Sequence, residues 1–153
     1  MVGHIRDKDY FTSLELDSNN SVIYYGSVEN HSNEFFSLLL NAKCFVLAST
    51  LETPGLAALE AAALGIPLII TSEGCSKEYF GDIKTYYDGK KGNVIELAEL
   101  INNLFVSPLI GKVKFNQIKK FTWDNCVNKQ IDIYKELLWK LLFTLKILLQ
   151  WME

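Results

Sequence analysis

Short apolar runs alternate with helical patterns along this 153-residue chain, and this alternation constrains its fold more than any other feature. The runs at 43–48 and 67–71 are apolar without a break, which is typical of strands buried on both faces. A further strand is predicted at 21–25, ending at Gly26. Apolar residues at helical spacing predict helices over 32–42, 54–64, 93–105 and 111–121. Strands alternating with helices predict an α/β fold, with a Rossmann-like parallel sheet and helices on both faces.

The two ends of the chain suggest its organisation. Thr122 is a suitable N-cap for a long last helix over 123–151, which would be roughly 40 Å long. We therefore expect a domain over 1–122 and a C-terminal helix over 123–153. Residues 1–5 resemble the end of a strand, so we expect the chain to begin partway through a larger unit.

Composition excludes several classes of protein. Apolar residues make up 49% and charged residues 22%, as in ordinary globular domains. The net charge of −3 disfavours a nucleic-acid binder. The three cysteines form no CxxC pair and no secretory signal opens the chain, so we expect buried thiols, no metal site and a cytoplasmic protein. No nucleophile elbow, P-loop or GxGxxG motif is present.

The loop at 49–55 is the first candidate for a ligand site, because parallel sheets bind ligands at the carboxyl ends of their strands. Thr53 is a plausible N-cap and Pro54 suits the first helical position. Gly55 lets another group approach the backbone closely. Free N–H groups at a helix start bind anions, and phosphate is the obvious one.

Two glutamates flank this helix start. Glu60 is the only charged residue in 54–64, a segment whose apolar character predicts a helix buried all round. A buried carboxylate needs hydrogen-bond donors, and the two hydroxyls of a sugar diol would supply them. Alternatively, Glu60 lies on a solvent-facing edge or pairs with a distant lysine or arginine. Glu52, eight positions earlier, is either a second ligand-contacting group or a surface carboxylate.

A second loop, at 71–82, follows the next buried strand at the same edge. Gly74 and Ser76 could bring further N–H groups towards a ligand, although an ordinary turn explains them equally. Lys77 is a candidate phosphate partner or simply a solvated lysine.

These residues form an ordered set that resembles a known family. The segments concerned are 45–49, 52–56, 59–61 and 65–67, with further likeness at 25–28, 74–82, 86–88, 121–123 and Tyr134. Two glutamates separated by seven residues, with Gly-Leu between them, are the mark of the retaining glycosyltransferases of the GT-B fold, family 4. The likeness covers roughly residues 2–138, in the right order.

The resemblance implies a domain that binds a UDP-, GDP- or ADP-linked sugar and transfers a hexose, with retention and without a metal, to a glycan or lipid-linked acceptor. It implies that Glu52 is catalytic and contacts the donor sugar near the anomeric centre. It also implies that Glu60 binds the ribose hydroxyls. The remaining donor-binding residues would be Thr53, Gly55 and Leu56 at the diphosphate or sugar, and Gly26 and Val28 at the base.

The sequence departs from the family pattern in three ways. The acceptor domain is missing, and so is the opening Gly-Arg and Lys that grip the diphosphate, for which Arg6 and Lys8 do not substitute. Ala48 replaces a proline. Each lost charge-assisted donor costs on the order of 1.5–3 kcal/mol. We therefore expect an N-terminally truncated donor half that is weak or inactive alone and works with a separate acceptor subunit, or a remnant.

The segment 137–152 is apolar on nearly every side but is interrupted by two lysines, and it is shorter than the ~20 residues of a membrane span. Self-association or another partner, a peripheral membrane contact, or packing within the chain would each cover it. The alternative function is accordingly a non-catalytic α/β module that interacts through this helix.

Overall fold

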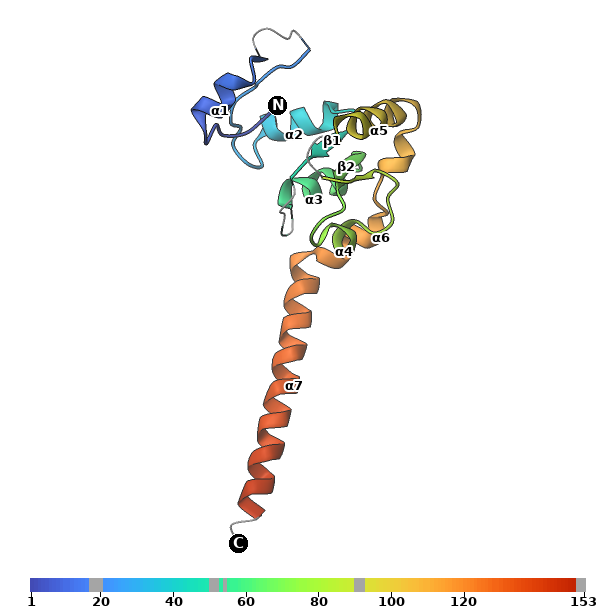
Figure 1. Cartoon of the computed structure of the whole chain (residues 1–153). Coiled ribbons are helices and arrows are strands. Elements are labelled where there is room, and N and C mark those ends of the chain that lie inside the picture. The colour runs from blue at the N-terminus through green and yellow to red at the C-terminus, as the bar shows by residue number, and fades with distance from the viewer. Residues whose placement is uncertain (17–20, 50–52, 54, 90–92, 151–153) are drawn as a thin grey trace. The chain divides into compact units, whose positions relative to one another are not determined.

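The computed structural model of the chain describes residues 1–16, 21–49, 53, 55–89 and 93–150, with no side-chain description for residues 149 and 150 (Figure 1). The chain divides into two compact units, Met1–Ala42 (unit 1) and Lys43–Glu153 (unit 2). Each unit is described by itself.

Unit 1 contains two helices that are capped by side chains. In α1 (Lys8–Ser13), which was not predicted, the Asp7 carboxylate accepts a hydrogen bond from the Tyr10 N–H. In α2 (Asn33–Asn41), the Ser32 hydroxyl accepts one from the Phe35 N–H. Each cap satisfies a donor that the first turn leaves without a helical partner. The helix predicted over 32–42 is confirmed.

The predicted strand at 21–25 is wrong. Unit 1 shows one isolated parallel bridge between Val2 and Gly26 among its described residues. The Gly3 N–H donates to the Gly26 carbonyl oxygen at 2.9 Å, and the Tyr25 N–H donates to Met1 at 2.8 Å. Residues 21–25 are of types that favour a strand. However, the segment that they pair with, residues 1–3, is too short to form a row of backbone hydrogen bonds.

Unit 2 is built on a parallel sheet of β1 (Phe45–Leu47), β2 (Leu68–Thr71) and β3 (Tyr86–Tyr87), in that order. All four residues of the central strand β2 are buried, as its uninterrupted apolar run predicts. The two longer strands are present, but β1 is not buried on both faces as predicted, because Val46 of this edge strand is 39% exposed. The two-residue strand β3 was not predicted, because so short a segment carries no periodic signal.

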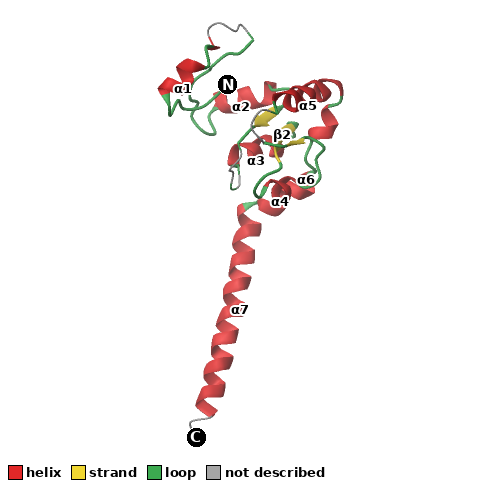
Figure 2. Cartoon of the chain, viewed as in Figure 1, coloured by secondary structure: helices red, strands yellow, loops and turns green. Residues whose placement is uncertain are grey.

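Helices cover both faces of this sheet, and Figure 2 shows the strands between α3 and α5. Ile69 of β2 packs with Tyr87 of β3 and with Leu104 of α5 (Val94–Val106) in a buried cluster. Successive strand residues face opposite sides, so Leu68 and Ile70 point away from α5. Contacts of α3 (Leu56–Ala63) with β1 and β2 complete the arrangement. The predicted α/β fold is confirmed.

The single helix predicted over 111–121 is wrong. The structure has a 3-10 turn η2 (Pro108–Gly111), a short helix α6 (Phe115–Ile118) and a second 3-10 turn η3 (Lys119–Phe121). Lys112 and Lys114 have extended backbones, with ψ of 128° and 131°. Gly111 is held against the Leu68 backbone, which stops the helical pattern from continuing through it.

The long last helix is confirmed as α7 (Trp123–Gln150). The Thr122 carbonyl oxygen accepts the Cys126 N–H at 3.0 Å, so Thr122 directly precedes the helix as expected. Most side chains of α7 are exposed over 126–148. None of the helices in the described ranges, α7 included, has the length and apolarity that crossing a membrane requires.

The cysteines are less buried than predicted. Cys44 and Cys75 are half-buried and Cys126 is exposed on α7. The expectation of buried thiols is therefore wrong for Cys126, because the helix that carries it leaves this side chain uncovered.

Candidate functional site

The carboxyl edge of the sheet in unit 2 brings two helix starts together. β1 ends at Leu47 and β2 ends at Thr71, and each strand leads into the next helix, α3 or α4 (Ser76–Phe80). Since β1 and β2 are parallel neighbours, both helices begin at the same edge. This is the edge at which the sequence predicts a ligand site.

Gly55 begins α3 in a left-handed conformation, with φ of 63° and ψ of 62°. Its carbonyl oxygen accepts the N–H groups of Ala58 at 2.9 Å and Leu59 at 3.1 Å. The predicted N-cap, Thr53, is therefore wrong: Gly55 occupies that position, and Thr53 is exposed. Only glycine adopts this backbone conformation without a steric cost, which explains why the cap carries no side-chain oxygen.

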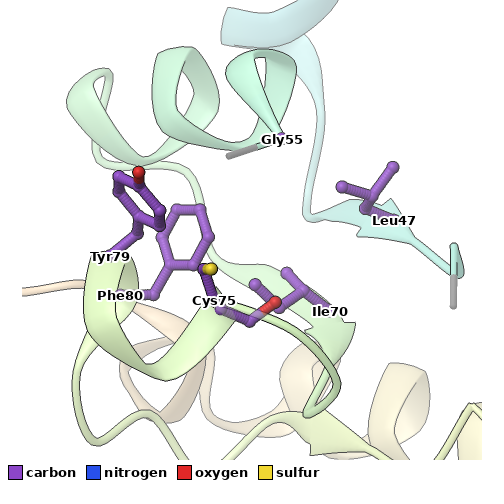
Figure 3. A pocket seen from close by; sticks show the side chains of 7 residues that line it. Leu47, Gly55, Ile70, Cys75, Tyr79 and Phe80 are labelled. Carbon is purple, nitrogen blue, oxygen red and sulfur yellow. The ribbon is translucent and has the colours of Figure 1, made fainter. Parts of the chain in front are cut away.

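A small hollow lies between the strand ends and the two helix starts (Figure 3). It is shallow and leaves no room even for a water molecule, so it is not a pocket of the roughly 300–1,000 Å³ that typically holds a ligand. The residues that line it are Leu47, Gly55, Ile70, Cys75, Ser76, Tyr79 and Phe80. None of these lining residues is charged, so an anion bound over this edge of the sheet, outside the hollow, would be met mainly by the backbone N–H groups at the start of α3.

Side chains from β3 and from the C-terminal part of unit 2 hold α4 in place. The Tyr86 hydroxyl donates to the carbonyl oxygens of Gly81 at 2.7 Å and Ser76 at 3.2 Å. Burial and the nearby Asp82 carboxylate raise the pKa of Tyr86 to about 12. The rings of Tyr79 and Phe121 lie 4.5 Å apart. These contacts fix the wall that α4 contributes to the hollow.

Glu60 lies on α3, half-buried. The helix buries one face through Ala58, Ala61 and Ala62, whereas Leu56 at its start is 67% exposed. The prediction that this helix is buried all round is therefore wrong, and Glu60 borders the buried face. The described residues of unit 2 leave the outer face of this helix uncovered, as the exposed Ala57 and Ala63 show.

Of the other predicted site residues, some lie among the residues that the structure describes and others do not. Glu52 and Pro54 lie outside the described residues. Gly26 and Val28 belong to unit 1, where Gly26 has φ of 90° and Val28 is half-buried. Leu56 and Glu60 lie on α3 and Gly55 is its N-cap, so these three are brought together. The roles assigned to all these residues remain predictions.

The contribution of α4 was not predicted, because the sequence at 71–82 favours a loop. Cys75, Tyr79 and Phe80 line the hollow together with the strand residues Leu47 and Ile70. The adjacent aromatic residues at 79 and 80 were a usable signal, since two large apolar side chains in a loop need a core to pack against.

The segment 71–82 also contains the residues that were considered as phosphate partners: Gly74 and Ser76 through their backbone N–H groups, and Lys77 through its side chain. Gly74, with φ of 64°, makes the turn before α4, and the side chain of Ser76 is buried. Lys77 is exposed on α4.

Metal-binding side chains do not gather in the parts of the chain that the structure describes. No group of three or more His, Cys, Asp or Glu residues is found there.

Comparisons with known proteins find one family and one distant relative of note. The family described as "Glycosyl transferases group 1" matches residues 1–120. An uncharacterized glycosyltransferase of Methanocaldococcus jannaschii is 24% identical over 135 residues, which cover 84% of this chain and 34% of that protein. The chain thus spans about a third of this relative's length. No solved structure matches the chain.

Proposed function

Since the chain belongs to the group 1 glycosyl transferases, we propose that unit 2 binds the sugar-nucleotide donor of a retaining hexosyltransfer reaction. The family transfers glycosyl groups, and it implies a nucleotide-sugar donor in general. The donor is a UDP-, GDP- or ADP-linked hexose, and the acceptor is a glycan or a lipid-linked sugar. The match covers 34% of the relative's length, and we propose that a separate subunit supplies acceptor binding.

The observation that supports this proposal is the layout of α3. Gly55 opens the helix at the carboxyl edge of the sheet, and Glu60 follows five residues later. Five helical residues span about 7.5 Å along the axis. A nucleoside diphosphate can bridge that spacing, with its phosphates at the helix start and its ribose beside Glu60.

Each end of that layout suits its part of the ligand. The first N–H groups of a helix have no partner within the helix, and with the positive end of the helix dipole they attract phosphate. A carboxylate accepts hydrogen bonds only, so Glu60 is suited to the two donating hydroxyls of a ribose. Phosphate held in this way needs no metal ion to neutralise it, and we propose metal-independent transfer.

Three further roles complete the proposal. Glu52 contacts the transferred sugar near the anomeric carbon and is the proposed catalytic residue. Thr53 contributes to the donor site of unit 2. The resemblance assigns Gly26 and Val28, which belong to unit 1, to recognition of the base. These assignments follow the resemblance of the residues at those positions to the family pattern.

The test is a comparison of ribonucleotides with analogues that lack the diol. Binding of UDP, GDP and ADP and of their 2′,3′-dideoxy analogues is measured by ligand-observed NMR or calorimetry on the wild-type chain and on Glu60→Gln. For one base, we expect the wild type to prefer the ribonucleotide by roughly tenfold or more, as the loss of one or two charge-assisted hydrogen bonds implies. Glu60→Gln should bind both forms about equally.

Glu99→Gln is the matched control, because Glu99 is an exposed glutamate of α5. It should retain the wild-type preference for the diol. A preference for the ribonucleotide that survives in Glu60→Gln, or the absence of binding by all three nucleotides, would contradict the proposal.

A second candidate function is a non-catalytic module that associates through α7. The exposed apolar side chains of that helix favour it, among them Leu138, Trp139 and Phe143. Association without nucleotide binding would support this alternative alone. Association together with nucleotide binding would fit an enzyme subunit.

A further inference from the structure

Helix α7 carries a continuous apolar seam with heptad spacing. Its members follow one another at steps of four and three residues, and all of them are apolar or aromatic. The heptad seam consists of Val127, Ile131, Tyr134, Leu138, Leu141, Leu145 and Leu148. Their side chains are between 42% and 58% exposed. Half-exposed apolar residues in an unbroken row form a surface that needs cover.

The spacing of the seam indicates what kind of surface covers it. A strict repeat of seven residues has a period of 3.5, whereas a straight helix has 3.6 residues per turn. A partner helix that winds around α7 keeps a 3.5-residue row in contact along its whole length, with each side chain inserted between four residues of the partner. The seam covers three heptads and about 33 Å of helix. This pattern is typical of a coiled-coil contact.

The flanks of the seam are compatible with a second copy of the same helix. The flanking heptad positions are Asn128, Gln130, Lys135, Leu137, Leu142 and Thr144. Lys135 alone among these is charged, and its ammonium lies 3.7 Å from the Asp132 carboxylate of its own helix. Two identical helices would therefore meet without rows of like charge, and Leu137 and Leu142 would widen the apolar contact. From the seam and its flanks we propose that α7 pairs with α7 of a second copy of this chain.

The opposite face of α7 argues against a membrane surface as the cover. Helices that lie on anionic membranes carry a polar face rich in lysine and arginine. Here that face carries Asp132 as well as lysines, and the Lys140 ammonium pairs with the Glu136 carboxylate at 2.7 Å. The exposed apolar side chains of Trp139 and Phe143 lie on the same face, so it is not a basic polar face. The proposal rests on α7 alone and is independent of the donor site proposed above.

The test compares two lysine-substituted variants by sedimentation equilibrium of the full chain under reducing conditions, which prevents disulfide bonds through the exposed Cys126. The seam variant is Leu138→Lys with Leu141→Lys. The matched control is Trp139→Lys with Phe143→Lys, which removes two exposed apolar side chains from positions outside the heptad seam. All four residues are exposed, so both variants should fold, and their circular dichroism is recorded to verify this.

We expect the wild type and the control to associate and the seam variant to be monomeric. The dissociation constant of the seam variant should rise by ~100-fold or more, because each pairing would place four uncompensated lysines in the seam. A monomeric wild type would overturn the proposal, as would equal weakening of both variants, which would indicate non-specific contact of apolar surface. A wild type that stays monomeric but sediments with vesicles of phosphatidylcholine and phosphatidylserine would assign α7 to a membrane surface instead.

Discussion

Gly55 controls how the chain enters α3, and its left-handed backbone makes its replacement informative. A side chain at φ of 63° is strained, so Gly55→Ala should lower the free energy of unfolding by about 1–2 kcal/mol. Gly55→Asn should cost less, because asparagine tolerates this conformation better than other residues. Urea denaturation of both variants measures the difference. An alanine variant as stable as the wild type would show that the turn before α3 is not held in this conformation.

Tyr86 anchors α4 through two carbonyl oxygens. Tyr86→Phe should lower the free energy of unfolding by about 1 kcal/mol at neutral pH, the net contribution of such a hydrogen bond. The exposed Tyr10, replaced by phenylalanine, is the matched control and should change stability little.

The raised pKa of Tyr86 adds a dependence on pH. The folded-state pKa of about 12 lies above the ordinary value of 10 that holds in the unfolded chain. The contribution of Tyr86 to stability is therefore fully present below pH 10 and is lost as the pH rises towards 12. Urea denaturation across this range should show a steeper loss of stability for the wild type than for Tyr86→Phe. Parallel curves would contradict the assignment.

At the scale of elements, the end of η2 is fixed against the central strand. A Cβ atom on Gly111 would lie 2.9 Å from Leu104 Cδ2 and 2.9 Å from the Leu68 carbonyl oxygen. Gly111→Ala should therefore destabilise unit 2 by about 1–3 kcal/mol, because the neighbouring backbone cannot easily yield. Leu109→Ala changes an exposed residue of the same turn and should stay within about 0.5 kcal/mol of the wild type. Equal midpoints of thermal unfolding for the two variants would contradict this packing.

The elements that the sequence predicted correctly are those whose pattern is long or uninterrupted. The apolar periodicity of α5 and α7 and the buried run of β2 each carry enough residues to define a period. The elements α4 and β3 are too short for that, and they depend on contacts such as the Tyr86 hydroxyl bonds. The strand predicted at 21–25 is wrong for a different reason. Its residue types favour a strand, but a strand also needs a pairing partner, which the local sequence does not reveal.

At the scale of the whole molecule, the sequence indicates the sheet edge at which a donor site is proposed, but not the residues that surround that edge. The rule that parallel sheets bind ligands at their carboxyl edge directs attention to α3 and to Glu60 before any coordinates are known. The left-handed turn at Gly55 and the wall formed by Cys75 and Tyr79 depend on how α4 packs, which is a tertiary effect. The role of Glu52 stays a prediction, because this residue lies outside the described part of the chain.

The proposed donor site on α3 is tested most directly by following the backbone amide signals in a ¹⁵N–¹H spectrum of the full chain as UDP, GDP or ADP is added. We expect one of these nucleotides to shift the signals of Leu56, Ala57 and Glu60, which lie together on α3. The signals of Glu99 and Asn102 on α5 should stay in place. Nucleotide-dependent shifts confined to other parts of the chain, or no shifts at millimolar concentration, would contradict a donor site built on α3.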